Sequence, residues 1–166
     1  MKKWIPCLLL IACSGAQTKE DVNDTAAIDI QSQGDVALFI NEVLAKSDTT
    51  EDWLELYNPQ DEELDISGFQ LQDSAQIPWS IPEGTVIDAQ GFLIIWADDA
   101  AEEGLHAPFK LSKEGEEVSL LSAEGDSIDT VLFPDLAPEE SYARIEDGSI
   151  DWEIREESTP GESNQL

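Results

Sequence analysis

Short apolar or alternating runs recur along the chain from Val36 onward, and clusters of turn-forming residues separate them. No stretch there keeps the 3.6-residue spacing of an amphipathic helix. Runs this short, at intervals of roughly 8–12 residues, are typical of the strands of a sandwich or barrel. We therefore predict an all-β fold. Strands are expected at residues 36–44, 53–57, 64–66, 69–73, 79–81, 85–87, 91–96, 117–121, 127–133, 142–145 and 152–154.

Four segments carry more detailed expectations. Residues 91–96, Gly-Phe-Leu-Ile-Ile-Trp, form the most apolar run and are predicted to be a central strand. Residues 123–126, Ala-Glu-Gly-Asp, are a good hairpin connection. Residues 97–104 are the one segment that could hold a helical turn. Residues 156–166 are polar and are expected to run loosely over the surface.

The first thirteen residues have the pattern of an export signal. Lys2 and Lys3 form a cationic head, and the uncharged run that follows ends at Ala12. This run is too short to cross a bilayer as a helix, which takes about 20 apolar residues, but it fits the centre of a secretory signal. Leu-Ile-Ala-Cys at 10–13 resembles a lipobox, which implies cleavage before Cys13 and lipidation of its thiol. An ordinary cleavage site at residues 14–16 is the alternative.

The expected organisation is therefore a lipoprotein signal peptide at 1–12, a lipidated cysteine with a flexible polar tether at 13–36, and one domain at 37–164. Residues 14–35 carry only isolated apolar side chains, too few to form a core of their own. Removal of residues 1–12 leaves 154 residues, enough for one domain of ordinary size. Cys7 would leave with the signal and Cys13 would be acylated, so no disulfide or thiolate site is expected.

The charge of the chain narrows the choice of partners. The whole sequence has 8 basic and 37 acidic residues, a net charge of −29. Loss of the two signal lysines takes the expected mature chain from −29 to −31. A surface this acidic repels nucleic acid and anionic phospholipid. We therefore expect no nucleic-acid partner, although divalent cations would be attracted.

A series of segments in order along the chain resembles the lamin tail domain in its bacterial, exported form. The resemblance covers about residues 38–164 and implies an immunoglobulin-like antiparallel β-sandwich. Ala143 departs from it, because the family often has glycine there. The sequence shows neither the catalytic domains that often accompany this domain in bacteria nor the rod of nuclear lamins, so filament formation is not expected to carry over. The segments are 39–43 (FINEV), 53–58 (WLELYN), 64–71 (LDISGFQL), Asp73, 82–85 (PEGT), 91–99 (GFLIIWADD), 105–106 (LH), 109–112 (FKLS), 116–120 (EEVSL), 141–144 (SYAR), 147–148 (DG) and 159–164 (TPGESN).

Oxygen-bearing side chains at strand ends and turns suggest a candidate calcium site. Calcium takes 6–8 oxygen ligands, and adjacent strands could bring several carboxylates together. The candidate ligands are Glu42, Asp52, Glu55, Asn58 and Asp73, with Asp98, Asp99 and Asp129 in similar positions. No segment has the spacing of a known calcium loop. The alternatives are solvated turn residues and side chains that hydrogen-bond to loop backbone.

The aromatic residues and the single histidine raise the questions of binding and catalysis. Trp53 and Trp79 adjoin loops and are candidates for a platform on which a sugar stacks, whereas Trp96 is expected in the core. The alternative is that all the tryptophans outside the signal are packed in the sandwich. His106 has no motif-linked serine partner and is expected to be a loop residue that fixes local structure by a hydrogen bond. No catalytic residue is assigned.

The sequence thus predicts a non-catalytic, lipid-anchored binding module of the cell envelope. It would attach to the membrane through the lipid on Cys13 and would lie on the outer membrane if the cell has two membranes. Its partner would be a surface protein, an envelope component or a glycan. The alternative is a calcium-binding accessory domain or a component of a weak metal-dependent hydrolase. No cofactor is expected, with calcium as the one possible exception.

Overall fold

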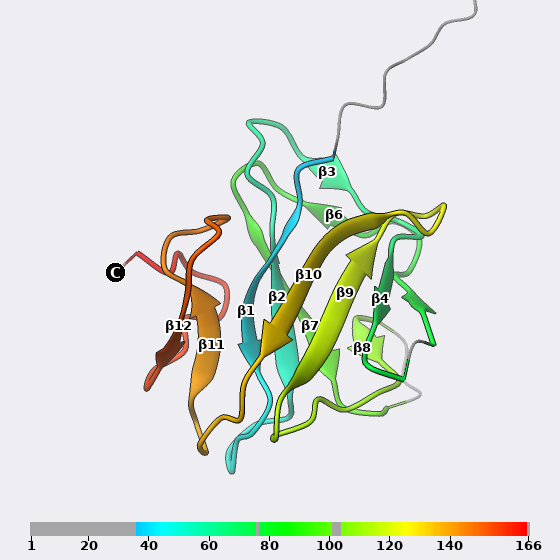
Figure 1. Ribbon diagram of the computed structural model, residues 1–166. Coiled ribbons are helices and arrows are strands. Elements are labelled where there is room, and N and C mark those ends of the chain that lie inside the picture. The colour runs from blue at the N-terminus through cyan, green and yellow to red at the C-terminus, as the bar shows by residue number, and fades with distance from the viewer. Residues whose placement is uncertain (1–35, 76, 101–103, 166) are drawn as a thin grey trace, which may run out of the picture. The chain divides into compact units, whose positions relative to one another are not determined.

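The computed structural model describes residues 36–75, 77–100 and 104–165 (Figure 1). These residues form twelve strands and no helix. Across the same residues there is consequently no helix of the length and apolarity needed to cross a membrane. The strands are β1 (Phe39–Leu44), β2 (Trp53–Tyr57), β3 (Leu64–Asp65), β4 (Gln70–Gln72), β5 (Trp79–Ser80), β6 (Val86–Ile87), β7 (Phe92–Ala97), β8 (His106–Ala107), β9 (Glu116–Leu121), β10 (Ser127–Phe133), β11 (Ser141–Arg144) and β12 (Trp152–Arg155).

The strands form two main sheets, which confirms the predicted all-β sandwich (Figure 1). The larger sheet has the order β12-β11-β1-β2-β7-β8, and the smaller has the order β10-β9-β4-β5. A two-stranded ribbon, β3-β6, accompanies them. All neighbours are antiparallel except β7 and β8, which pair in parallel at Trp96 and His106. The sandwich is therefore antiparallel in all but one edge pair.

The helical turn suggested at residues 97–104 is absent from the described part of that segment, and residues 101–103 lie outside the described residues. Ala97 ends β7, and Asp98 forms an isolated antiparallel bridge with Lys110, so neither residue is helical. The chain then returns to run beside β7 in the same direction, with Trp96 N–H bonded to Leu105 O at 2.8 Å. The strand predicted at residues 91–96 is present as β7 and is paired on both sides, but it does not lie in the middle of the sheet. The strand is fifth of six, because only the two-residue β8 lies outside it, and β1 and β2 occupy the middle.

The core lies between the two main sheets. Alternate residues of each strand face it, as the period of two in a strand requires. In β2 these are Leu54 and Leu56, and both are fully buried. In β1 a bulge between Ile40 and Glu42 shifts the register, so that Ile40 and Val43 both face the core. The shift places Glu42 opposite Glu55 on the outer face of the six-stranded sheet.

Gly115 occupies a position that no other residue fits, at the entry to β9. Its φ is +89°, and a Cβ there would lie 2.7 Å from the carbonyl carbon of Pro134. We expect Gly115→Ala to lower the free energy of unfolding by about 2 kcal/mol, since backbone strain and a backbone clash add together. Urea denaturation measures the change.

Gly125 supplies the matched control for this substitution. Its φ is +91°, almost the same, but no atom lies within 4 Å of the position that a Cβ would take. Gly125→Ala should therefore cost only the conformational part, about 1 kcal/mol. Equal losses at the two positions would show that the close approach of residues 133–134 to Gly115 does not matter.

Candidate functional site

Two of the candidate metal ligands, Glu42 and Glu55, lie side by side on the outer face of the six-stranded sheet. They are direct partners on β1 and β2. Both side chains are completely buried, and neither forms an ion pair among the described residues. Two carboxyl groups buried together without a counter-ion resist ionisation. The pair is therefore the most unusual electrostatic feature of the domain.

The C-terminal segment, residues 156–165, covers this carboxyl pair. Thr159 N–H donates to Glu42 Oε2 at 3.0 Å, and Gly161 N–H donates to Glu55 Oε2 at 2.6 Å. Thr159 and Asn164 are buried as a result, with exposures of 7% and 3%. The expectation that this segment runs loosely over the surface was wrong, because its polar groups are used to satisfy buried partners.

The hydrogen bonds around Thr159 supply Glu42 with few donors for a buried carboxyl group. The amide of Asn164 is oriented by its Nδ2 group, which donates to the carbonyl oxygens of Asn41 and Arg144. Asn164 Oδ1 therefore faces Thr159 Oγ1 at 2.8 Å and accepts its only proton. The 3.1 Å bond from Thr159 Oγ1 to Glu42 Oε2 shares the same proton in a three-centre arrangement, and a protonated Glu42 would relieve this sharing by donating to Oγ1. Burial independently raises the pKa of Glu42.

Burial also raises the pKa of Glu55, to about 7. The hydrogen bonds from Gly161 N–H and Asn41 Nδ2 lower it, but the neighbouring carboxyls of Glu42 and Asp147 raise it further. Asn41 bridges the group, donating from Nδ2 to Glu55 Oε1 at 3.1 Å and to Asp147 Oδ1 at 3.0 Å. This polar cluster can exchange protons near neutral pH, but it offers no open face to a substrate.

Arg144 lies on the opposite face of the same strands. The sequence predicts no role for it, and it appears there only as part of the segment 141–144 that resembles the lamin tail domain. The guanidinium donates to Ile40 O at 2.7 Å, to Asp129 Oδ2 at 2.8 Å and to Ser149 O. It is also sandwiched between the rings of Phe39 and Trp152, with centroids 5.1 and 4.5 Å away. Only 5% of Arg144 is exposed, so it joins β10 of one sheet to β1 and β11 of the other.

The five candidate calcium ligands do not form one site. Asp52 and Asn58 flank opposite ends of β2, and the five residues of that extended strand lie between them, so their Cα atoms are about 20 Å apart. Asn58 holds a loop instead, with Nδ2 donating to Glu62 O and Asp88 O. Asp73 follows β4 in the other sheet. Across the part of the chain that the structure describes, no three His, Cys, Asp or Glu side chains are grouped as metal ligands.

The additional acidic positions have local partners. Asp129 binds Arg144, and Asp98 Oδ2 accepts a hydrogen bond from His106 Nδ1 at 2.6 Å. Partial burial opposes ionisation of Asp98, but the bonds from His106 and Ala100 outweigh it and lower its pKa. His106 therefore makes a hydrogen bond that fixes local structure, as the sequence indicated, although it lies in β8 rather than in a loop. Asp99 adopts φ = 56° in the turn that follows Asp98.

The two candidate stacking residues have different environments. Trp53 is 2% exposed and lies between Leu44 and Trp96 on the neighbouring strands, so its ring has no face open to a ligand. Trp152 is also engaged, stacked on Tyr142 with centroids 5.1 Å apart. Trp79 is half-buried and lines a groove. Trp79 is thus the one of the two that retains a surface for binding.

The groove at Trp79 lies beside β5, the last strand of the smaller sheet. Its volume is about 300 Å³, which is at the lower end for small-ligand sites. It brings together two of the sequence-predicted residues, Trp79 and Asp73, in one concave surface. Among the described residues its lining consists of Asp73, Ala75, Ile77, Pro78, Trp79, Ser80, Pro108 and Phe109.

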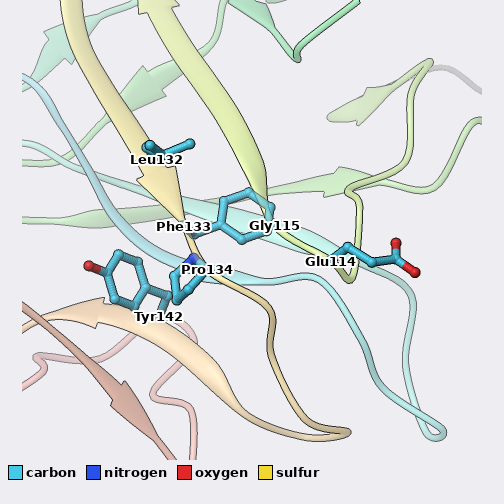
Figure 2. A pocket seen from close by; sticks show the side chains of 6 residues that line it. All are labelled: Glu114, Gly115, Leu132, Phe133, Pro134 and Tyr142. Carbon is cyan, nitrogen blue, oxygen red and sulfur yellow. The ribbon is translucent and has the colours of Figure 1, made fainter.

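A second hollow lies at the end of β10 (Figure 2). Figure 2 shows Leu132, Phe133 and Pro134 between Tyr142 on one side and Gly115 on the other. This hollow is broad and open, and it holds no cluster of polar groups that could orient a ligand. Gly115 and residues 133–134, which approach each other closely, form part of the wall of this hollow. The hollow is therefore a consequence of the fold.

A sequence-family match covers most of the strands described above. The family model of the lamin tail domain matches residues 31–134, which is more than half of the chain. The chain belongs to the lamin tail domain family. The matched region includes β1 to β10, the groove and Glu42 and Glu55. A comparison with curated proteins finds no match.

The matched region of this lamin tail domain ends before the strands that complete its larger sheet. β11 pairs directly with β1, and β12 pairs with β11. The C-terminal segment that covers Glu42 and Glu55 also lies after residue 134. The fold of this lamin tail domain therefore depends on residues well beyond those that define the family match.

Proposed function

We propose that this chain is a lipid-anchored binding module displayed on the cell envelope, with Cys13 as its attachment point. The observation that supports the proposal is family membership, because lamin tail domains are immunoglobulin-like domains that generally serve as interaction modules. The export pattern at residues 1–13 lies outside the described residues and contributes from the sequence alone. The strong negative charge favours a protein or glycan partner over nucleic acid.

The geometry supports a binding role rather than catalysis. An enzyme needs an acid, base or nucleophile within reach of a substrate. The two carboxyls with raised pKa values, Glu42 and Glu55, are buried beneath residues 159–164 and bonded to them. Their positions suit the attachment of one segment of the domain to another. The proposed module therefore acts by binding a partner through its exposed surface.

The anchor is tested by Cys13→Ser. We expect the wild-type chain to sediment with membranes and to incorporate labelled fatty acid, because several acyl chains at about 0.8 kcal/mol per buried methylene hold a protein firmly. The variant should lose the label and leave the membrane fraction. If the variant stays membrane-bound and the wild type carries no lipid, the lipoprotein part of the proposal fails.

The binding role is tested by affinity capture. The full chain, immobilised through its C-terminus, is incubated with extract of the cell envelope, and retained material is identified by mass spectrometry. We expect a component that is retained by the chain and absent from a bead control of equal negative charge. Failure to retain any such component at cellular concentrations would contradict the binding role.

A further inference from the structure

The groove beside β5 combines three features that a ligand site needs. Trp79 and Phe109 supply aromatic surface, and Pro78 and Pro108 add rigid apolar walls. Asp73 places one carboxylate in the same lining. Largely apolar walls with few polar groups are typical of sites where the apolar part of a ligand is buried and one group is oriented.

The carboxylate of Asp73 is positioned by its own turn. Asp73 Oδ1 accepts a hydrogen bond from Ala75 N–H at 2.9 Å, which fixes the side chain next to the groove. The nearest basic residue along the lining segments is Lys110, and its ammonium group lies 3.5 Å from Glu51. The structure therefore gives Asp73 no cationic partner among the described residues.

The edge of β5 is not suited to accept another strand. The strand is only two residues long and pairs with β4 through Gln70–Ser80 and Leu71–Trp79. Pro78 and Pro82 flank it and lack an N–H group. Short edge strands bordered by proline are a common protection against pairing with a further chain. A polypeptide that occupies the groove is therefore expected to bind through a side chain and not by adding a strand.

The net negative charge of the chain favours a positively charged side chain as the occupant of the groove. A net charge of −29 attracts cations and raises their local concentration at the surface. A lysine or arginine has an apolar stem that can lie on aromatic and proline surface while its charged end remains at the rim. Its cation is also attracted to the face of a tryptophan ring.

We propose that this groove is a docking site for a lysine or arginine side chain of a cationic protein segment. The stem lies along Trp79, Pro78 and Phe109, and the charged end pairs with Asp73. The proposal rests on the proposed binding function and supplies its partner class. The partner is a basic polypeptide of the envelope, recognised one side chain at a time rather than by strand addition.

The test is a calorimetric titration of the full chain with a capped nine-residue peptide of alternating lysine and serine. The matched peptide carries acetyl-lysine, which keeps the stem and removes the charge. We expect the lysine peptide to bind at least tenfold more tightly than the acetylated peptide. Asp73→Asn should weaken lysine-peptide binding about fivefold, and Trp79→Leu about threefold to tenfold.

Glu63→Gln is the control variant, because Glu63 is exposed and does not line the groove. It removes the same charge and should change the affinity less than twofold. Equal weakening by Asp73→Asn and Glu63→Gln would overturn the proposal, since the peptide would then bind to diffuse charge. Equal affinity for the acetylated peptide would also overturn it and would indicate an uncharged occupant. Trp79→Phe keeps an aromatic ring and controls for misfolding of the leucine variant.

The same variants separate this inference from the proposed function. If the envelope component captured by the wild-type chain is lost with Trp79→Leu and Asp73→Asn, the groove is its docking site. If both variants retain the component fully, the groove proposal fails and the binding role stands. If the wild type captures nothing while the peptide titration behaves as expected, the binding role in the envelope fails and the groove chemistry stands.

Discussion

Replacing Arg144 with alanine is expected to lower the free energy of unfolding by about 3–5 kcal/mol, the range typical of breaking a buried ion pair. The substitution leaves Asp129 without its partner at 2.8 Å and deprives the carbonyls of Ile40 and Ser149 of their donor. It also empties the space between Phe39 and Trp152. Chemical denaturation of the full chain in urea measures the change.

Two further variants show which property of Arg144 matters. Arg144→Lys keeps the charge but cannot direct three donors to separate acceptors, so we expect it to recover less than half of the loss. Lys113→Ala removes a lysine whose side chain is 59% exposed and 3.9 Å from Glu114, and it should change stability by less than about 0.5 kcal/mol. A loss below about 1 kcal/mol for Arg144→Ala would contradict the role of Arg144 as a link between the sheets.

The domain should also become less stable as the pH rises toward neutrality. The pKa of Glu55 rises from 4.5 to about 7 on folding, so the folded state binds a proton that the unfolded state releases. This stabilisation is complete below about pH 4.5 and is lost as the pH rises through 7. At about 1.4 kcal/mol per pH unit, we expect a loss of roughly 2–3 kcal/mol between pH 5 and pH 8 from Glu55, measured as a lower urea midpoint at pH 8.

The raised pKa of Glu42 acts in the same direction. Asp65, Asp98 and Glu139 have lowered pKa values, so their stabilisation is lost only under more acidic conditions. Glu55→Gln should flatten the profile between pH 5 and pH 8, with a loss of about 1 kcal/mol for one weakened hydrogen bond. An unchanged slope in this variant would assign the pH dependence to other groups.

Glu42→Gln tests whether Glu42 is protonated in the folded domain, the direction in which burial shifts its pKa. The glutamine amide can donate to Thr159 Oγ1 as the protonated carboxyl does, while its oxygen accepts from Thr159 N–H. We expect this variant to match the wild type at pH 5 and to exceed it in stability at pH 8. A variant much less stable than the wild type at pH 5 would show that Glu42 is ionised there.

Most of the strands could be predicted from the sequence. Apolar alternation predicted Trp53–Tyr57 and Ser127–Phe133 with their observed bounds, because both strands have one face on the core and turns at both ends. β8 was missed because its two residues have no period to detect. The position of β7 was misjudged because apolarity reports burial of a strand and not its place in the sheet order.

The polar cluster could not be derived from local pattern. Glu42 and Glu55 were predicted as candidate calcium ligands. The bulge at Asn41, however, decides which face of the sheet Glu42 occupies. That bulge has no sequence signal as specific as a glycine in a turn. The partners Thr159 and Asn164 are more than 100 residues distant from β1, and only the folded chain shows that they close over it.

The covering of β1 by the last residues has a consequence for the order of folding. Asn164 bonds to the backbone of Asn41 across 123 positions, and Thr159 bonds to Glu42 across 117. Contacts so distant in sequence form late and slow the folding of a domain. Synthesis delivers β1 and β2 before residues 159–164, so Glu42 and Glu55 remain in contact with water, where carboxyls of ordinary pKa ionise at neutral pH, until that segment docks. Docking of residues 159–164 must then displace that water and favours protonation of both carboxyls, whose pKa values are raised by burial, so this docking is the step that closes the outer face of the six-stranded sheet.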